Sequence, residues 1–209
     1  MAKIGIIGDG NVGTALTNGL TRGGYEVRAV GKEPQKVKEI GQWAETIILA
    51  VPFTERENAI RELGDVNGKI LVDVTNALTP RMGTAVGPRN ESGAEQVQKM
   101  AKGAKVVKAF NTVFAAHMDK GTVHGEKLTV LVAGDDEQAR NKTIELARAI
   151  GFDAVNAGPL QNARWLETMG LLNIQLGFVV GHGIAAGFKY VHESPKATST
   201  GKTPSTQQR

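Results

Sequence analysis

The chain has 209 residues, enough for one sizeable domain, and its 41% hydrophobic and 22% charged residues are ordinary for a globular protein. A net charge of +4 from scattered Lys and Arg, with only 5% aromatic residues, disfavours nucleic-acid binding. The sequence contains no cysteine, which excludes disulfides, thiolate zinc sites and cysteine nucleophiles. Because the N-terminus enters a strand with no signal peptide, we expect a cytoplasmic protein.

The N-terminal stretch carries the most informative motif. Residues 3–7 (Lys-Ile-Gly-Ile-Ile) have the apolar, β-branched character of a short buried strand. Gly8, Gly10 and Gly13 follow at G-x-G-x-x-G spacing, and residues 11–20 have the pattern of a helix. Glycines at these positions permit a tight turn, close approach of a pyrophosphate and close helix–strand packing, in that order. The stretch therefore predicts a dinucleotide site at a helix N-terminus.

Apolar runs and turn residues divide the rest of the chain into alternating strands and helices. Further strands are predicted at 25–30, 46–51, 69–75, 105–110, 128–133 and 152–156, and further helices at 34–40, 54–63, 93–102 and 137–149, with Thr54 and Asp135-Asp136 as caps. This alternation predicts an α/β fold, a Rossmann-type doubly wound parallel sheet with a small C-terminal helical extension. Residues 81–92, broken by Gly and Pro, are expected to be a loop that closes over a ligand.

The C-terminal part differs in composition from the rest. We expect a dinucleotide-binding domain over 1–158, helices over 159–190 that pack on it and form a homodimer, and a disordered tail over 191–209. Residues 170–188 carry no charge, yet their polar residues and five glycines favour a buried or dimer-forming helix pair over a membrane span. We therefore expect neither a membrane nor a nucleic-acid partner.

The end of the second predicted strand bears on the choice of nucleotide. An acidic residue there would bind the ribose hydroxyls of NAD, whereas a basic one accommodates the 2′-phosphate of NADP. Here Gly31 leaves room and Lys32 supplies positive charge, but Glu33 could repel a phosphate or reach a ribose. The balance favours NADP over NAD.

The other strand ends carry small, apolar or amide residues and no convincing acid–base pair, so we expect no catalytic side chain. These ends, 50–53, 75–76 and 111–113, lie in the crevice where such folds bind ligands. The four histidines lack metal-ligand spacing, so no metal site is expected, and His117 is better explained as a helix residue than as a catalytic acid. Hydride transfer between two stacked rings needs no proton relay from the protein.

The motifs at 8–13, 51–53, 72–76, 107–114 and 157–164 resemble those of the NADPH:coenzyme F420 oxidoreductase family. The resemblance extends over about residues 3–188, and its most specific segments are Lys-Ala-Phe-Asn-Thr-Val and Ala-Gly-Pro-Leu. It implies one nucleotide-binding domain, a small helical C-terminal part, a dimer, and hydride transfer between NADPH and the deazaflavin ring without a catalytic acid or base.

Carried over by position, the resemblance also implies site residues. It puts the pyrophosphate on Gly8, Asp9, Gly10, Asn11 and Val12, and the 2′-phosphate near Gly31 and Lys32. Along the path to the nicotinamide it places Ala50, Val51, Pro52, Phe53 and Asn76. The carboxamide would meet the backbone around Val113 and Ala115, with Asn111 and Thr112 beside it.

Three departures from the family pattern leave alternatives open. The family's basic pair after the second strand is reduced to Lys32, and the next crossover is short. At the position of Asn111, archaeal enzymes that use the deazaflavin tend to have histidine, whereas the Phe-Asn-Thr-Val form resembles the reductase domains of membrane ferric reductases. One alternative is therefore an NADPH-dependent FMN, FAD or ferric reductase. The lack of any acid–base residue keeps a second alternative open, a non-catalytic NADP-binding sensor.

Overall fold

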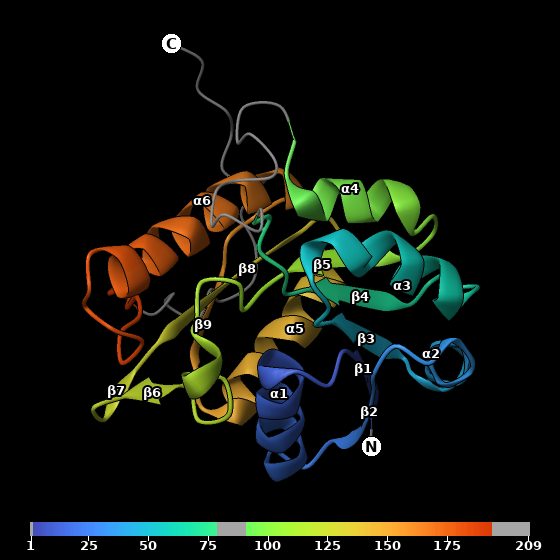
Figure 1. The fold of residues 1–209 in the computed structure, drawn as a ribbon, viewed down its shortest axis with the longest axis horizontal. Coiled ribbons are helices and arrows are strands. Elements are labelled where there is room, and N and C mark those ends of the chain that lie inside the picture. The colour runs from blue at the N-terminus through green and yellow to red at the C-terminus, as the bar shows by residue number, and fades with distance from the viewer. Residues whose placement is uncertain (1, 79–90, 194–209) are drawn as a thin grey trace, which may run out of the picture.

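The computed structural model describes residues 2–78 and 91–193. A central sheet contains strands from both of these ranges (Figure 1). Its seven strands have the order β2-β1-β3-β4-β5-β8-β9. Their bounds are β1 (Lys3–Ile7), β2 (Glu26–Val30), β3 (Thr46–Leu49), β4 (Ile70–Asp73), β5 (Lys105–Lys108), β8 (Thr129–Gly134) and β9 (Asp153–Asn156). A separate hairpin consists of β6 (Thr122–Val123) and β7 (Glu126–Lys127).

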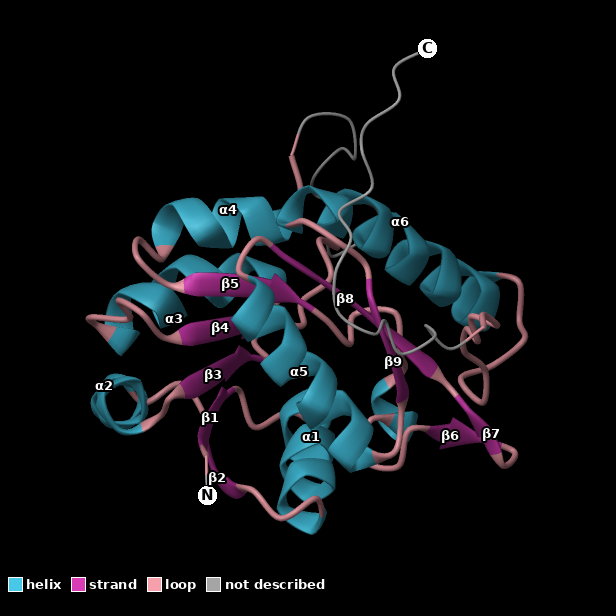
Figure 2. Ribbon diagram, turned by 180° about the vertical axis from the view of Figure 1, so that it is seen from behind, coloured by secondary structure: helices cyan, strands magenta, loops and turns pink. Residues whose placement is uncertain are grey.

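Helices cover both faces of this sheet. They are α1 (Asn11–Arg22), α2 (Pro34–Trp43), α3 (Arg56–Leu63), α4 (Gly93–Met100), α5 (Glu137–Ile150) and α6 (Ala163–Ile174). Helices α1 and α5 lie on the face that Figure 2 presents, and α2, α3 and α4 lie on the other. Helix α6 contacts α4 and β8. The expected doubly wound Rossmann-type α/β fold is therefore confirmed.

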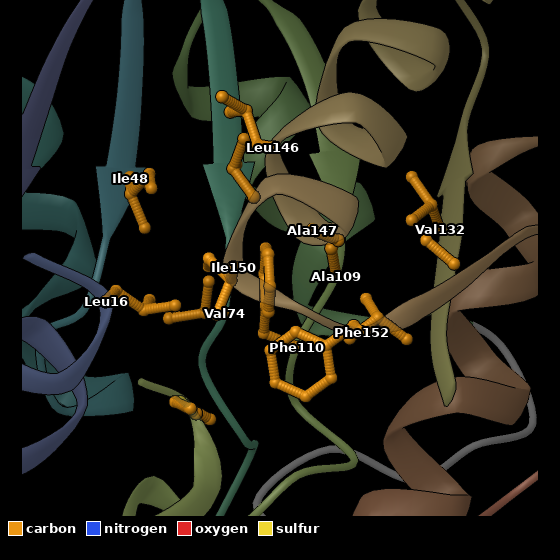
Figure 3. Close-up of a cluster of buried hydrophobic side chains, with 14 of the residues drawn as sticks. Leu16, Ile48, Val74, Ala109, Phe110, Val132, Leu146, Ala147, Ile150 and Phe152 are labelled. Atoms are coloured by element: carbon orange, nitrogen blue, oxygen red, sulfur yellow. The ribbon is translucent and has the colours of Figure 1, made fainter. Parts of the chain in front are cut away.

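The strands are buried on both faces, which explains their nearly continuous apolar sequences. On one face, Leu16 and Ile150 from α1 and α5 meet Ile48 of β3 (Figure 3). Phe110 and Phe152 pack there edge to face, with ring centroids 5.9 Å apart. Each such side chain contributes roughly 1.5–3 kcal/mol on burial, so this cluster holds the β1–α1 unit against the second half of the sheet.

The last two strands of the sheet, β8 and β9, run against the other five. Strand β8 pairs with β5 in antiparallel fashion, whereas β1 to β5 pair in parallel and β8 pairs in parallel with β9. A parallel connection needs a crossover, usually a helix, and α5 provides one between β8 and β9. The segment between β5 and β8 has only a 3₁₀ turn (Ala115–His117) and the β6–β7 hairpin. The expected all-parallel order is therefore corrected at β8 and β9, and the hairpin was not predicted.

Several predicted boundaries also shift. Strand β5 ends at Lys108, before the predicted Phe110, because Phe110 has a φ of 63°, in the left-handed region. Thr54 does not cap α3, since a 3₁₀ turn (Phe53–Glu55) precedes that helix. Asp136 does cap α5 and accepts a hydrogen bond from Ala139 N–H at 2.8 Å, as predicted.

The C-terminal region is helical over a shorter length than expected. After α6 comes one π-helical turn (Gln175–Val179), and residues 180–193 form no helix. Gly181 and Gly183 there have φ of 94° and 78°, which a right-handed helix does not allow. In residues 2–78 and 91–193, no helix is long and apolar enough to span a bilayer. The predicted loop at 81–92 and tail at 191–209 lie outside the described residues, except for 91–92 and 191–193.

Candidate dinucleotide site

The glycine turn between β1 and α1 has the geometry that its sequence predicts. Gly8 has a φ of 114°, and a Cβ there would stand 2.3 Å from the Ala50 carbonyl oxygen. A Cβ on Gly13 would stand 1.8 Å from the Gly8 carbonyl oxygen, so the helix packs directly on the turn. Side chains at these two positions are excluded by the backbone itself.

Gly10 differs, because a Cβ there would meet no protein atom within 4 Å. It is exposed and lies at the N-cap of α1, where no side chain bonds the first helical N–H groups. Those N–H groups have no partner within the helix and carry the positive end of the helix dipole. The open face at Gly10 therefore fits a pyrophosphate, which a side chain would displace.

A cavity of about 610 Å³ extends from this turn toward the C-terminal segment. Four of the predicted residues, Asp9, Gly10, Asn11 and Ala115, line it together. The other lining residues are Thr14, Ala15, Asn18, Phe114, Ala116, Asp119, Phe178 and Ile184. Its walls combine helix-terminal amides with apolar and aromatic side chains, which suits a ligand with phosphates at one end and a flat ring at the other.

Aromatic residues and a histidine fix the far wall of this cavity. The rings of Phe114 and Phe178 meet edge to face, with centroids 5.7 Å apart. His117, expected in a helix and found in the 3₁₀ turn, has its Nε2 2.8 Å from the Ile184 carbonyl oxygen. Residues of the C-terminal segment thus complete a cavity that begins at the N-terminal glycine turn.

A second cavity of about 70 Å³ lies at the end of β2. Three predicted residues line it, Gly31, Lys32 and Val51, together with Ile7, Val37, Glu55, Asn58, Ala59 and Glu62. Asp9 connects the two cavities, because it lines the larger one and its carboxylate lies over Gly31. Of the remaining predicted residues at the β3 end, Ala50 and Phe53 are partly exposed and Pro52 is exposed. The Phe53 ring stacks against the Arg56 guanidinium at 3.5 Å.

The predicted amides at the ends of β4 and β5 bond to each other. Asn76 Nδ2 donates to the Asn111 carbonyl at 2.9 Å, and Asn111 Nδ2 donates to Asn76 Oδ1 at 3.1 Å. Asn111 also donates to the Leu166 carbonyl of α6 at 2.8 Å and is 3% exposed. Gly170 packs on the pair so closely that a Cβ would stand 2.5 Å from Asn76 Oδ1. The side chains of Asn76 and Asn111 therefore hold α6 in place over the ends of β4 and β5.

Backbone groups of Thr112 and Val113 are likewise engaged in hydrogen bonds within the protein. The Thr112 carbonyl accepts from Asn173 Nδ2 of α6 at 3.1 Å, and Val113 N–H donates to the Phe110 carbonyl at 3.0 Å. Both residues are buried. Neither lines the two cavities described above, in contrast to Ala115.

A buried ion cluster lies near the ends of β4 and β5 and was not predicted from the sequence. Lys108 Nζ is 3.0 Å from Asp73 Oδ2, 3.0 Å from Glu167 Oε1 and 2.6 Å from the Thr75 carbonyl oxygen. The side chains of Lys108 and Asp73 are completely buried. Asp73 and Lys108 are paired in register across β4 and β5, each inside an apolar run. A charged residue of each sign at matching positions in two adjacent strands was the available signal.

The same cluster ties α6 to α4. Glu167 accepts hydrogen bonds from the N–H groups of Gly93 and Ala94 at 2.9 and 3.2 Å. Burial lowers the pKa of Arg56, whose Nη1 donates to the Gly93 carbonyl at 2.8 Å; the carboxylates of Asp73 and Glu167 oppose that shift. Arg164 of α6 makes a bidentate pair with Glu95, which holds the pKa of that carboxyl at about 2. These charges position α6 over the strand ends.

The ionisable side chains of the larger cavity are those of Asp9 and Asp119. Within the described residues, no group of three or more His, Asp or Glu side chains is arranged to hold a metal ion. The arrangement offers free N–H groups for phosphates at the glycine turn and an open apolar wall at Ala115 and Phe178 against which a planar ring can lie.

Comparisons with known proteins agree with this geometry. Residues 3–43 match the family described as "NADP oxidoreductase coenzyme F420-dependent". Over 163 residues the chain is 31% identical to the F420-dependent NADP reductase of Methanocaldococcus jannaschii, an alignment that covers 75% of this chain and 71% of that protein. A crystal structure from Arthrobacter sp. FB24, provisionally designated an F420-dependent NADP-reductase, superposes with a TM-score of 0.81 at 27% identity, over 92% of this chain and 100% of that one.

Metalloreductases are also similar to this chain. It is 32% identical over 183 residues to metalloreductase STEAP3 of Rattus norvegicus, an alignment that covers 81% of this chain but 36% of that protein. The chain thus spans about a third of the length of the curated metalloreductases it matches. Sequence, fold and glycine-turn geometry together show that this chain belongs to the coenzyme F420-dependent NADP oxidoreductase family.

Proposed function

We propose that this protein transfers hydride between NADP(H) and the deazaflavin coenzyme F420. The observation that carries the proposal is the cavity of about 610 Å³, which continues from the open face of Gly10 to a wall formed by Ala115, Phe114 and Phe178. A nucleotide held at the glycine turn would have its nicotinamide end directed into an open, partly apolar groove. A second ring stacked on the nicotinamide there would exclude water from the space between the two rings.

The chain's own residues would act by binding and positioning. Helix-terminal N–H groups from Gly10, Asn11 and Val12 would bind the pyrophosphate, and Lys32 beside Gly31 would meet the 2′-phosphate. Ala50 to Phe53 would line the adenosine side. Because Val113 N–H is bonded to Phe110, a carboxamide at this place would use the Val113 carbonyl or the Ala115 backbone.

A nicotinamide bound there would supply one hydride, that is, two electrons carried with one proton, and the acceptor would gain this hydride and one further proton from water. The protein's role is then to hold the two rings at ~3–3.5 Å and to keep other water away. The buried pair Asn76–Asn111 and the Lys108 cluster would support this geometry indirectly, by seating α6 above the strand ends.

A second candidate acceptor is a flavin, FMN or FAD, with electrons passing on to ferric iron. The similarity to metalloreductases over 81% of the chain favours it, as does asparagine at position 111. A non-catalytic NADP-binding sensor is the alternative of another class. In all three cases the nucleotide would bind in the same place.

The deciding experiment is anaerobic mixing of the protein with NADPH and, in separate cuvettes, F420, FMN or FAD. We expect selective bleaching of the F420 band. Bleaching of FMN or FAD alone would identify the protein as a flavin reductase. Retained NADPH binding without bleaching of any acceptor would favour the non-catalytic sensor. Gly10→Val is the control, because it should remove turnover with every acceptor.

We also propose that the 159–190 region packs on the 1–158 domain and forms a homodimer. On α6 and the turn that follows, five large apolar side chains are 50–68% exposed, namely Trp165, Leu172, Phe178, Val179 and Val180. A patch of this kind is typical of a protein–protein interface. Sedimentation equilibrium would test it: Phe178→Glu should shift the mass toward the monomer, and an unchanged mass would contradict the proposal.

A further inference from the structure

The space above Gly31 is filled by carboxylates from two different loops. A Cβ built on Gly31 would stand 2.9 Å from Asp9 Oδ2 and 3.1 Å from Glu33 Oε2. Asp9 comes from the glycine turn after β1, whereas Glu33 precedes α2 in the loop after β2. Because Gly31 has no side chain, the Asp9 carboxylate reaches across to the position that a side chain at the end of β2 would otherwise occupy.

The two carboxylates are in different states. Glu33 is paired with Lys36 at 3.3 Å, and its pKa is held below its ordinary value, first by its own backbone N–H and then by Lys36. Asp9 is exposed, and its backbone carbonyl accepts a hydrogen bond from Thr14 Oγ1 at 3.1 Å. Among residues 2–78 and 91–193, no side chain forms an ion pair with the Asp9 carboxylate, which leaves it available to a ligand.

In nucleotide-binding folds of this type, the end of β2 faces the adenosine ribose. A carboxylate there accepts hydrogen bonds from the ribose hydroxyls, whereas a 2′-phosphate brings a second negative charge into the same space. Lys32 is the cation next to Gly31, and Lys36 is already paired with Glu33. With Glu33 and Lys36 paired to each other, Asp9 is the carboxylate left to face Lys32 and the ribose at this position.

We propose that Asp9 reads the 2′-position of the ribose and makes the site accept NAD(H) at least as tightly as NADP(H). Asp9 does so by accepting a hydrogen bond from the 2′-hydroxyl and by repelling a 2′-phosphate. The carboxylate that other dinucleotide-binding folds place at the end of β2 is here supplied by the glycine turn. The inference rests on the proposed dinucleotide site, but not on the identity of the electron acceptor.

Calorimetric titration with ADP-ribose and 2′-phospho-ADP-ribose tests this directly, because neither probe carries a nicotinamide or takes part in turnover. We expect the wild-type protein to bind ADP-ribose at least as tightly as the phosphorylated probe. Asp9→Asn should shift the ratio of the two dissociation constants about tenfold toward the phosphorylated probe. Asp119→Asn is the matched control: it removes the other carboxylate of the same cavity and should leave the ratio unchanged.

Two results would overturn the proposal: a wild-type protein that binds the phosphorylated probe more tightly than ADP-ribose, or an unchanged ratio in Asp9→Asn. Because Asp9 is exposed, thermal unfolding of the variant should match that of the wild type, which separates binding from folding. A shifted ratio in a protein that reduces no acceptor would refute the proposed hydride transfer alone. Failure of both probes to bind would overturn both proposals.

Discussion

Two regions help to shape the candidate site, but the chain builds them differently. One is the glycine turn at Gly8–Gly13. The other, here called the seat of α6, is the set of contacts that hold α6 over the strand ends, made by Lys108, Asp73, Glu167 and Arg56 and, at its outer edge, by Glu95 and Arg164. At the turn, three backbone positions suffice, because Gly8 and Gly13 lie against backbone carbonyls and Gly10 is open. At the seat of α6, side chains from β4, β5, α3, α4 and α6 form one connected set of ion pairs and hydrogen bonds. The turn depends on short local sequence, whereas the seat depends on residues far apart in the chain.

The largest expected effect comes from breaking the seat. Lys108→Ala leaves the buried carboxylate of Asp73 without its cation, so we expect the free energy of unfolding to fall by about 3–5 kcal/mol in urea titrations. Lys102→Ala, at an exposed lysine, should change it by no more than about 0.5 kcal/mol. If both variants lost the same small amount, the buried cluster would contribute little to stability.

The next effect separates two glycines of the turn. Gly13→Ala puts a Cβ 1.8 Å from the Gly8 carbonyl and should cost about 1–3 kcal/mol of stability. At Gly10 a Cβ would meet no protein atom within 4 Å, so we expect Gly10→Val to change stability by about 1 kcal/mol or less, while binding of every dinucleotide falls at least about 100-fold. Thermal unfolding and calorimetric titration measure the two effects, and intact binding in Gly10→Val would mean that its open face holds no pyrophosphate.

A smaller effect is expected at Lys32. Lys32→Ala should weaken NADPH binding by roughly 1.5–3 kcal/mol, through loss of a charge-assisted contact with the 2′-phosphate. NADH binding should hardly change. Fluorescence titration with both nucleotides checks this, and equal weakening of both would show that Lys32 does not meet the phosphate.

The smallest effect concerns the outer edge of the seat. Arg164 holds the pKa of Glu95 at about 2, below its ordinary value of 4.5. Stability from this pair is therefore fully present above pH 4.5 and is lost as the pH falls toward 2. Glu95→Gln should flatten the fall in stability over that range and cost about 1 kcal/mol or less at pH 7, because the pair is partly solvated. A wild-type acid profile in the variant would contradict this.

The two regions were also unequally predictable from sequence. The strand, the glycine spacing and the first residues of the helix occupy eleven consecutive residues, 3–13, so local pattern was enough to predict the turn. Asp73, Lys108 and Glu167 come from β4, β5 and α6, and their meeting depends on the sheet register and on where α6 packs. Sequence periodicity carries neither kind of information.

Asn76 and Asn111 show a second limit. Their position at adjacent strand ends was predicted correctly, and the resemblance implied that they lie beside the cofactor. The hydrogen bonds of Asn111 to Asn76 and to Leu166 give it a packing role that depends on Gly170, 59 residues further along the chain. In the same way, the reversal of β8 follows from the lack of a crossover helix after β5, where the strand pattern alone is equally compatible with either direction.

The bonds of Glu167 have a consequence for how the native protein opens. Helices near a chain terminus commonly fray and exchange their amide protons early. Here, lifting α6 would expose Lys108 and Asp73 without a full set of partners and would free two N–H groups of α4 at the same time. Helix α6, the start of α4 and the ends of β4 and β5 should therefore open as one cooperative unit, with hydrogen-exchange protection in α6 close to that of the central strands.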